Sequence, residues 1–90
     1  MLRALVFFAA CLAVAGCTPS TERVCARKVK LSEDRFGKMD PVSHKQGFRH
    51  CVELAEREKR EHLERYKCRS ACVLDAKHLD DVDMCERECS

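Results

Sequence analysis

The chain has 90 residues, 36% of them charged, and a formal net charge of only +2 at neutral pH. A balance this close excludes a general polyanion-binding surface, so we expect no nucleic acid partner. Aromatic residues make up only 6% of the chain, whereas eight residues are cysteines. We therefore expect one small domain that is stabilised by disulfides in an oxidising compartment, because its apolar core is limited.

Residues 1–16 are typical of a signal peptide that is removed from the mature protein. A single basic residue, Arg3, precedes an apolar run over residues 4–14. This run is too short for a membrane span, which needs about 20 apolar residues. The alternative is a buried helix of a cytosolic protein, but the rest of the chain is too polar to cover one.

The sequence Val14-Ala15-Gly16-Cys17 closes the apolar run and resembles the lipobox of bacterial lipoproteins. The resemblance implies cleavage before Cys17 and covalent attachment of diacylglycerol and a fatty acyl chain, such as palmitate, to this cysteine. Several chains make a stable anchor, whereas one gives only marginal membrane binding. Thr18 stands where the family's inner-membrane retention signal has Asp, which implies the outer membrane of a Gram-negative envelope. We expect a signal peptide over 1–16, a lipidated linker over 17–21 and a cysteine-rich helical domain over 22–90.

The mature chain has one strongly predicted long helix. Residues 22–31 form either a brief helix or an extended arm, and residues 32–42 are expected to be irregular because they contain Gly37 and Pro41. A helix over about 43–76 begins either at a capping box from Ser43 to Gln46 or at Asp40, with Pro41 in the first turn. A second helix over about 80–89 begins near Asp80 or Asp81.

Six cysteines remain after Cys11 and Cys17 are set aside, and their spacing predicts how they pair. Two occur four residues apart on each helix, so each pair lies on one helix face. When two residues face each other in an antiparallel hairpin, their residue numbers add up to the same total as those of every other facing pair. Cys68 with Cys89 and Cys72 with Cys85 meet this condition, which selects these two disulfides. The swapped pairing needs parallel helices, which the short connection forbids. By elimination, Cys25–Cys51 joins the arm to the long helix. The predicted fold is therefore all-α, a disulfide-stapled antiparallel helical hairpin with an irregular N-terminal arm.

The two C-x₃-C motifs, at 68–72 and 85–89, resemble those of the plant α-hairpinin peptides and of small chaperones of the mitochondrial intermembrane space. Both families form a helical hairpin with an inner and an outer disulfide. The resemblance implies the fold but leaves the function open, because such hairpins inhibit proteases, attack microbes or carry client proteins. If the hairpin is an inhibitor, Lys77 near the turn could enter a trypsin-like specificity pocket.

The sequence contains no catalytic constellation, so we expect a non-enzymatic envelope protein that acts as a structural or protein-interaction module. It would contact the membrane through its lipid anchor, and it would also bind a protein partner in the envelope.

The alternative to protein interaction or protease inhibition is metal binding by cysteines with Met84 and His50, His62 or His78. Zinc knuckles usually have C-x₂-C spacing, so we expect no metal site. Basic residues between Arg23 and Arg49 suggest either ordinary solvated surface or contact with anionic headgroups.

Overall fold

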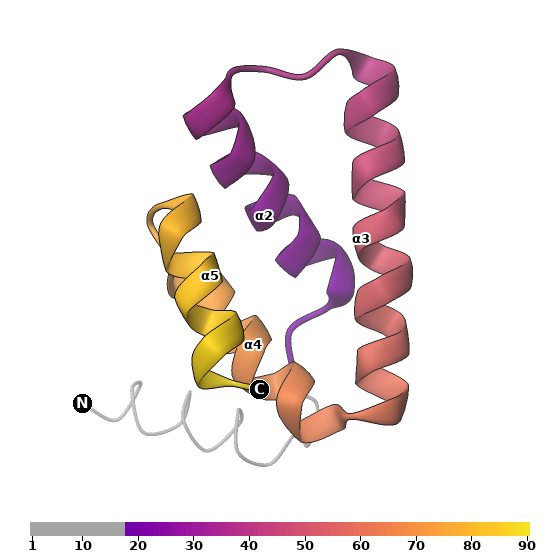
Figure 1. The fold of residues 1–90 in the computed structure, drawn as a ribbon. Coiled ribbons are helices and arrows are strands. Elements are labelled where there is room, and N and C mark those ends of the chain that lie inside the picture. Colours follow the sequence, from indigo (N-terminus) through magenta and orange to yellow (C-terminus); the bar gives the residue numbers. More distant parts are fainter. Residues whose placement is uncertain (1–17) are drawn as a thin grey trace, which may run out of the picture.

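The computed structural model describes residues 18–90, which contain four helices and no strand (Figure 1). The helices are α2 (Thr21–Phe36), α3 (Pro41–Glu61), α4 (Leu63–Asp75) and α5 (Leu79–Glu88). This confirms the all-α prediction. The predicted signal peptide and the predicted lipidation site at Cys17 lie outside the described residues. None of the four described helices is both long enough and apolar enough to cross a bilayer.

The three predicted disulfides are present. Cys68–Cys89 and Cys72–Cys85 join α4 to α5, and the Cα atoms of each pair are 5.7 Å apart. Cys25–Cys51 joins α2 to α3 with a Cα separation of 5.8 Å. The α4–α5 pair is thus the antiparallel hairpin that the two C-x₃-C motifs predicted.

The N-terminal arm is a regular helix rather than an irregular segment, which corrects the expectation for residues 32–36. Ser20 caps α2 by accepting a hydrogen bond from the Arg23 amide, and Gly37 ends it with a φ of 97°. Near its end, Lys30 and Asp34 form an i,i+4 ion pair of 3.6 Å, and Leu31 is buried. The burial of Leu31 in the core explains why helix persists through Ser32, Glu33 and Asp34, which are not strong helix formers as a group.

The predicted long helix over about 43–76 is two helices, broken at His62. This residue has φ −143° and ψ 64°, and it ends α3 and precedes α4. In a straight helix, Glu58 and Arg69 would lie about 16 Å apart along the axis, too far for their side chains to meet. Across the break they form a 3.1 Å ion pair. Neither proline nor glycine occurs at the bend, and this tertiary contact is possible only because the helix is broken.

The start of α3 uses one of its two predicted candidates, whereas α5 begins at Leu79, slightly before the predicted start near Asp80 or Asp81. Asp40 caps α3 and accepts a 3.0 Å hydrogen bond from the Ser43 amide, with Pro41 as the first helical residue. Hydrogen bonding by the Ser43 side chain, and then by its backbone amide, lowers the pKa of Asp40. At α5, the cap position belongs to His78, and the Asp81 carboxylate accepts the amide hydrogen bonds of Lys77 and His78. Asp81 therefore stabilises the start of α5 from within its first turn.

The core lies between α2, α4 and α5, and α3 is attached at its side. Its buried members come from these three helices and the turn after α4: Val24, Leu31, Val73, Ala76, Val82 and Cys85. By contrast, no residue of the 21-residue α3 is buried. Its apolar residues Phe48, Val52 and Ala55 are only partly covered. The Cys25–Cys51 disulfide is thus a major constraint on the position of α3.

Removal of this disulfide is expected to loosen α3 selectively. The double variant Cys25→Ala/Cys51→Ala should speed amide hydrogen exchange throughout α3, because little apolar burial holds the helix in place. Its matched control is Cys72→Ala/Cys85→Ala. The control should lower the free energy of unfolding by about 3 kcal/mol, while α3 stays as protected as the rest of the domain. Equal exchange of α3 in the two variants would contradict this account of how α3 is held.

Candidate functional site

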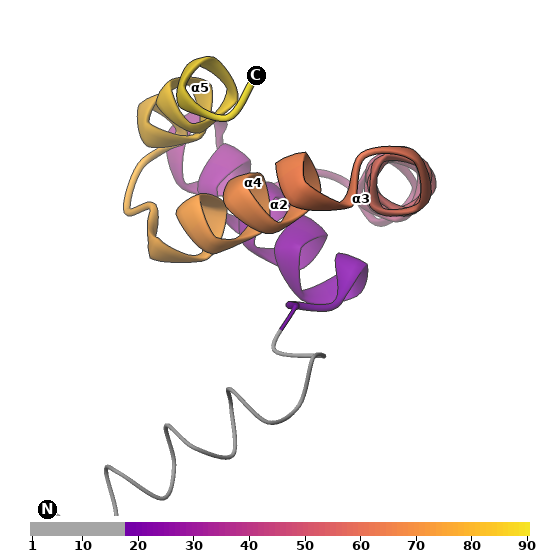
Figure 2. The same cartoon turned by 90° about the horizontal axis from the view of Figure 1, so that it is seen from below.

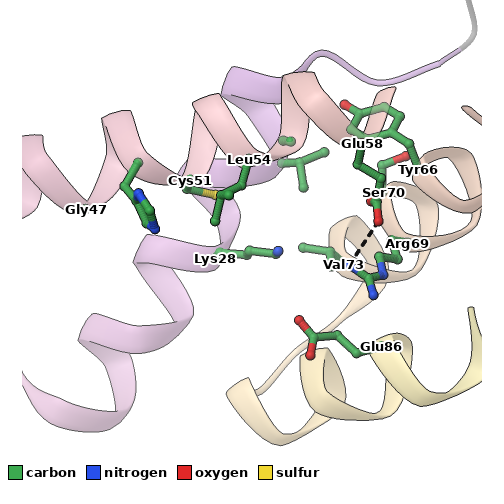
Figure 3. A pocket seen from close by; sticks show the side chains of 13 residues that line it. Lys28, Gly47, Cys51, Leu54, Glu58, Tyr66, Arg69, Ser70, Val73 and Glu86 are labelled. Atoms are coloured by element: carbon green, nitrogen blue, oxygen red, sulfur yellow. Dashed lines mark ion pairs between the residues drawn. The ribbon is translucent and has the colours of Figure 1, made fainter. Parts of the chain in front are cut away.

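A groove of about 320 Å³ lies between α3 on one side and α4 on the other, with α2 at its base (Figure 3). Its apolar lining comes from α2, α3 and α4 and comprises Val24, Cys51, Leu54, Ala55 and Val73. Charged and polar side chains surround this lining, namely Lys28, His50, Glu58, Tyr66, Arg69, Ser70 and Glu86. An apolar surface with a few polar groups around it is the usual composition of a binding site.

The α3 side of the groove remains open because α3 packs incompletely. Leu54 is 48% exposed although it borders the groove. Gly47 also lines the groove, and a methyl group placed on it would meet no atom within 4 Å. The groove therefore has room along α3 and presents an apolar side chain that the domain itself does not cover.

A carboxylate held by two arginines lies beside the apolar lining. Glu58 Oε2 is 3.1 Å from Nη1 of Arg69 and 3.4 Å from Nε of Arg65 (Figure 3 shows the pair with Arg69). The Glu58 side chain is only 18% exposed. These ion pairs join α3 to α4 across the break at His62, and they leave Glu58 engaged rather than available as a general base.

Tyr66 connects the groove to the start of the described chain. Its ring is buried, and its hydroxyl donates a 2.7 Å hydrogen bond to the carbonyl oxygen of Pro19. Burial raises the pKa of the Tyr66 hydroxyl, and the nearby carboxylates of Glu56, Glu22 and Glu58 raise it further. The neutral hydroxyl can therefore keep donating to Pro19 over the physiological pH range.

The residues considered for a metal site are not brought together. All six cysteines of residues 18–90 are in disulfides, and no group of three or more His, Cys, Asp or Glu residues in this part of the chain could hold a metal ion. His50 lines the groove, His62 lies at the break and His78 begins α5. Met84 is exposed on α5.

Lys77 is exposed at the tip of the hairpin, as its position between the cysteine motifs predicted. It lies in the three-residue connection 76–78, whose flanking residues Ala76 and His78 have extended backbones with ψ of 140° and 157°. The Cys72–Cys85 disulfide joins the helices that flank this connection. The tip is therefore a short, braced segment that presents a lysine side chain to solvent.

The groove itself was not predicted from the sequence. Its lining residues come from four helices, and only the incomplete packing of α3 exposes them together. One available signal was the run of seven polar residues between Ala55 and Leu63, which indicated that α3 could not be covered on all sides. No protein-family model, curated protein or solved structure matches this chain.

Tyr66 is expected to make the stability of the domain fall in alkaline solution. Because the pKa of Tyr66 is raised in the fold, its contribution is fully present below the ordinary tyrosine pKa of about 10. It is lost as the pH rises through the folded-state pKa. Denaturant unfolding across this range should show a steeper loss for the wild type than for Tyr66→Phe. Parallel curves for the two proteins would contradict this role of Tyr66.

Proposed function

We propose that this protein is a non-enzymatic lipoprotein of the bacterial envelope, anchored through Cys17, whose helical domain binds a partner protein. The observation that carries the binding role is the open groove beside α3, where Leu54 is half exposed next to a buried core. The anchor is supported by the lipobox sequence Val14-Ala15-Gly16-Cys17 and by the disulfides, which suit an oxidising compartment.

The composition of the groove favours a protein segment over a reacting substrate. Leu54, Ala55 and Val73 offer apolar contact, and Lys28 and Glu86 offer charges of opposite sign around it. A short amphipathic segment with an apolar anchor and flanking charges would match this pattern. The one carboxylate close to the apolar lining on α3, Glu58, is paired with two arginines. This arrangement suits recognition better than proton transfer.

The anchor is tested by metabolic labelling with a fatty acid. Wild-type protein should incorporate the label and fractionate with the outer membrane, because Cys17 would carry the acyl chains. The Cys17→Ser variant should remain unlabelled. An unlabelled wild-type protein that is released as a soluble periplasmic product would refute the anchor.

The groove is tested by photo-crosslinking in cells. A photoreactive amino acid at Leu54 should form a discrete adduct with an envelope protein, because this side chain borders the groove. The same amino acid at Leu63 is the matched control, since Leu63 is 42% exposed and does not line the groove. Adducts of the same size and yield at both positions would count against the groove as the binding surface.

Protease inhibition is a second candidate function. It is favoured by Lys77, which is exposed in the connection between α4 and α5, and by the Cys72–Cys85 disulfide, which joins these two helices. The purified mature domain should slow a trypsin-like protease at micromolar concentration, because the lysine would occupy the specificity pocket of the enzyme. Lys77→Ala should abolish the effect while leaving the fold intact. Unchanged protease rates with the wild-type domain would eliminate this candidate.

A further inference from the structure

The first residues of the described chain are fixed to the domain rather than free to act as a spacer. The Pro19 carbonyl accepts the Tyr66 hydrogen bond, and Ser20 caps α2. Thr21 is buried, and its hydroxyl donates a 2.6 Å hydrogen bond to Glu56. Cys17 precedes Pro19 by two residues, which span at most about 7 Å when extended. A lipid on Cys17 would therefore hold this end of the domain next to the membrane surface.

A basic stripe on α2 begins one helical turn beyond this fixed point. We define it as Arg23, Ala26, Arg27 and Lys30, whose spacing places them on one side of the helix. With Leu74 of α4, these residues line a shallow hollow of about 410 Å³ that contains no carboxylate. Among the described residues, Arg23 and Arg27 have no ion-pair partner, and Lys30 pairs only with the exposed Asp34. The guanidinium of Arg27 donates a hydrogen bond to the carbonyl oxygen of Ala76, so Arg23 and Lys30 are the cations of the stripe that are free to meet headgroups.

Acidic residues collect on α5, where Asp80 pairs with Arg35 near the far end of α2. In residues 79–90, α5 carries five acidic side chains against the single basic residue Arg87, namely Asp80, Asp81, Asp83, Glu86 and Glu88. Seen from below, the start of α2 and α5 lie on opposite sides of α4 (Figure 2). Charge is thus distributed unevenly: basic residues gather on one side of α2, with Glu22 and Glu56 near the helix start, whereas acidic residues gather on α5.

We propose that the basic stripe lies against the anionic headgroups of the membrane that holds Cys17, with the acidic α5 directed away from it. This inference rests on the proposed lipidation of Cys17. Attraction to a charged surface fades within a Debye length, about 8 Å at physiological salt. When α2 lies along the membrane surface, a tether of about 7 Å lets the whole stripe come within that range. Lys38 follows the far end of α2, which is about 24 Å long, and so contributes less.

The chain contains no tryptophan, so a single one can report which face meets the membrane. Ala26→Trp places the probe in the stripe, and Met84→Trp is its matched control on α5, since both positions are exposed on helices. Each lipidated protein would be purified from membranes and reconstituted in phosphatidylcholine vesicles with or without phosphatidylglycerol. A lipid with a nitroxide on its headgroup then quenches nearby tryptophan.

Quenching of Ala26→Trp should exceed that of Met84→Trp several-fold in vesicles that contain phosphatidylglycerol. Adding Arg23→Gln and Lys30→Gln should remove most of this difference, as should high salt, because the attraction is electrostatic. Equal quenching at the two positions in protein that floats with the vesicles would overturn the orientation and leave the anchor intact. The orientation would also be overturned if Arg23→Gln and Lys30→Gln left the quenching of Ala26→Trp unchanged. Wild-type protein that fails to float with the vesicles would refute the anchor and this inference together.

Discussion

The pairing of the two C-x₃-C motifs is the constraint on which the rest of the domain depends. Two disulfides fix α4 against α5 at both ends of a short hairpin, so Val73, Val82 and Cys85 form one apolar surface. Val24 and Leu31 of α2 then cover that surface. Few apolar side chains are available, and a hairpin without its bridges would bury too little area to offset the entropy of ordering it. The two disulfides therefore hold the helices in a defined arrangement that the small core alone would not stabilise.

The elements that could be predicted from the sequence are those that local spacing determines. Cysteines four residues apart on two helices allow only one antiparallel register, so the pairs at 68–89 and 72–85 followed from the sequence alone. Asp40 was one of two candidate caps of α3, because Pro41 follows it directly, and the structure selects it. The break at His62 was not predictable, since strong helix formers surround it and no proline or glycine marks it. The contact of Glu58 with Arg69 spans the break, and the hydrogen bond from Tyr66 to Pro19, 47 residues away, joins the start of α4 to the start of the described chain.

The marginal packing of α3 connects the fold to the candidate site. A helix without buried residues is usually a poor structural element, yet here one disulfide and the pairing of Glu58 with two arginines hold it. As a result, α3 lies beside the core without packing closely onto it. A binding groove in so small a domain is possible because α3 is held by these links and contributes little apolar area to the core. The polar run between Ala55 and Leu63 was visible in the sequence, but the groove itself depends on where four helices meet.

The groove and the basic stripe occupy different sides of α2, which makes anchoring and binding compatible. Val24 and Lys28 line the groove, and they follow Arg23 and Arg27 of the stripe by one residue each. One residue corresponds to a rotation of about 100° around an α-helix. When the stripe rests on a membrane, the groove therefore opens to the side rather than into the lipid. Under the proposed lipidation of Cys17, the short tether would therefore leave the groove accessible to a partner.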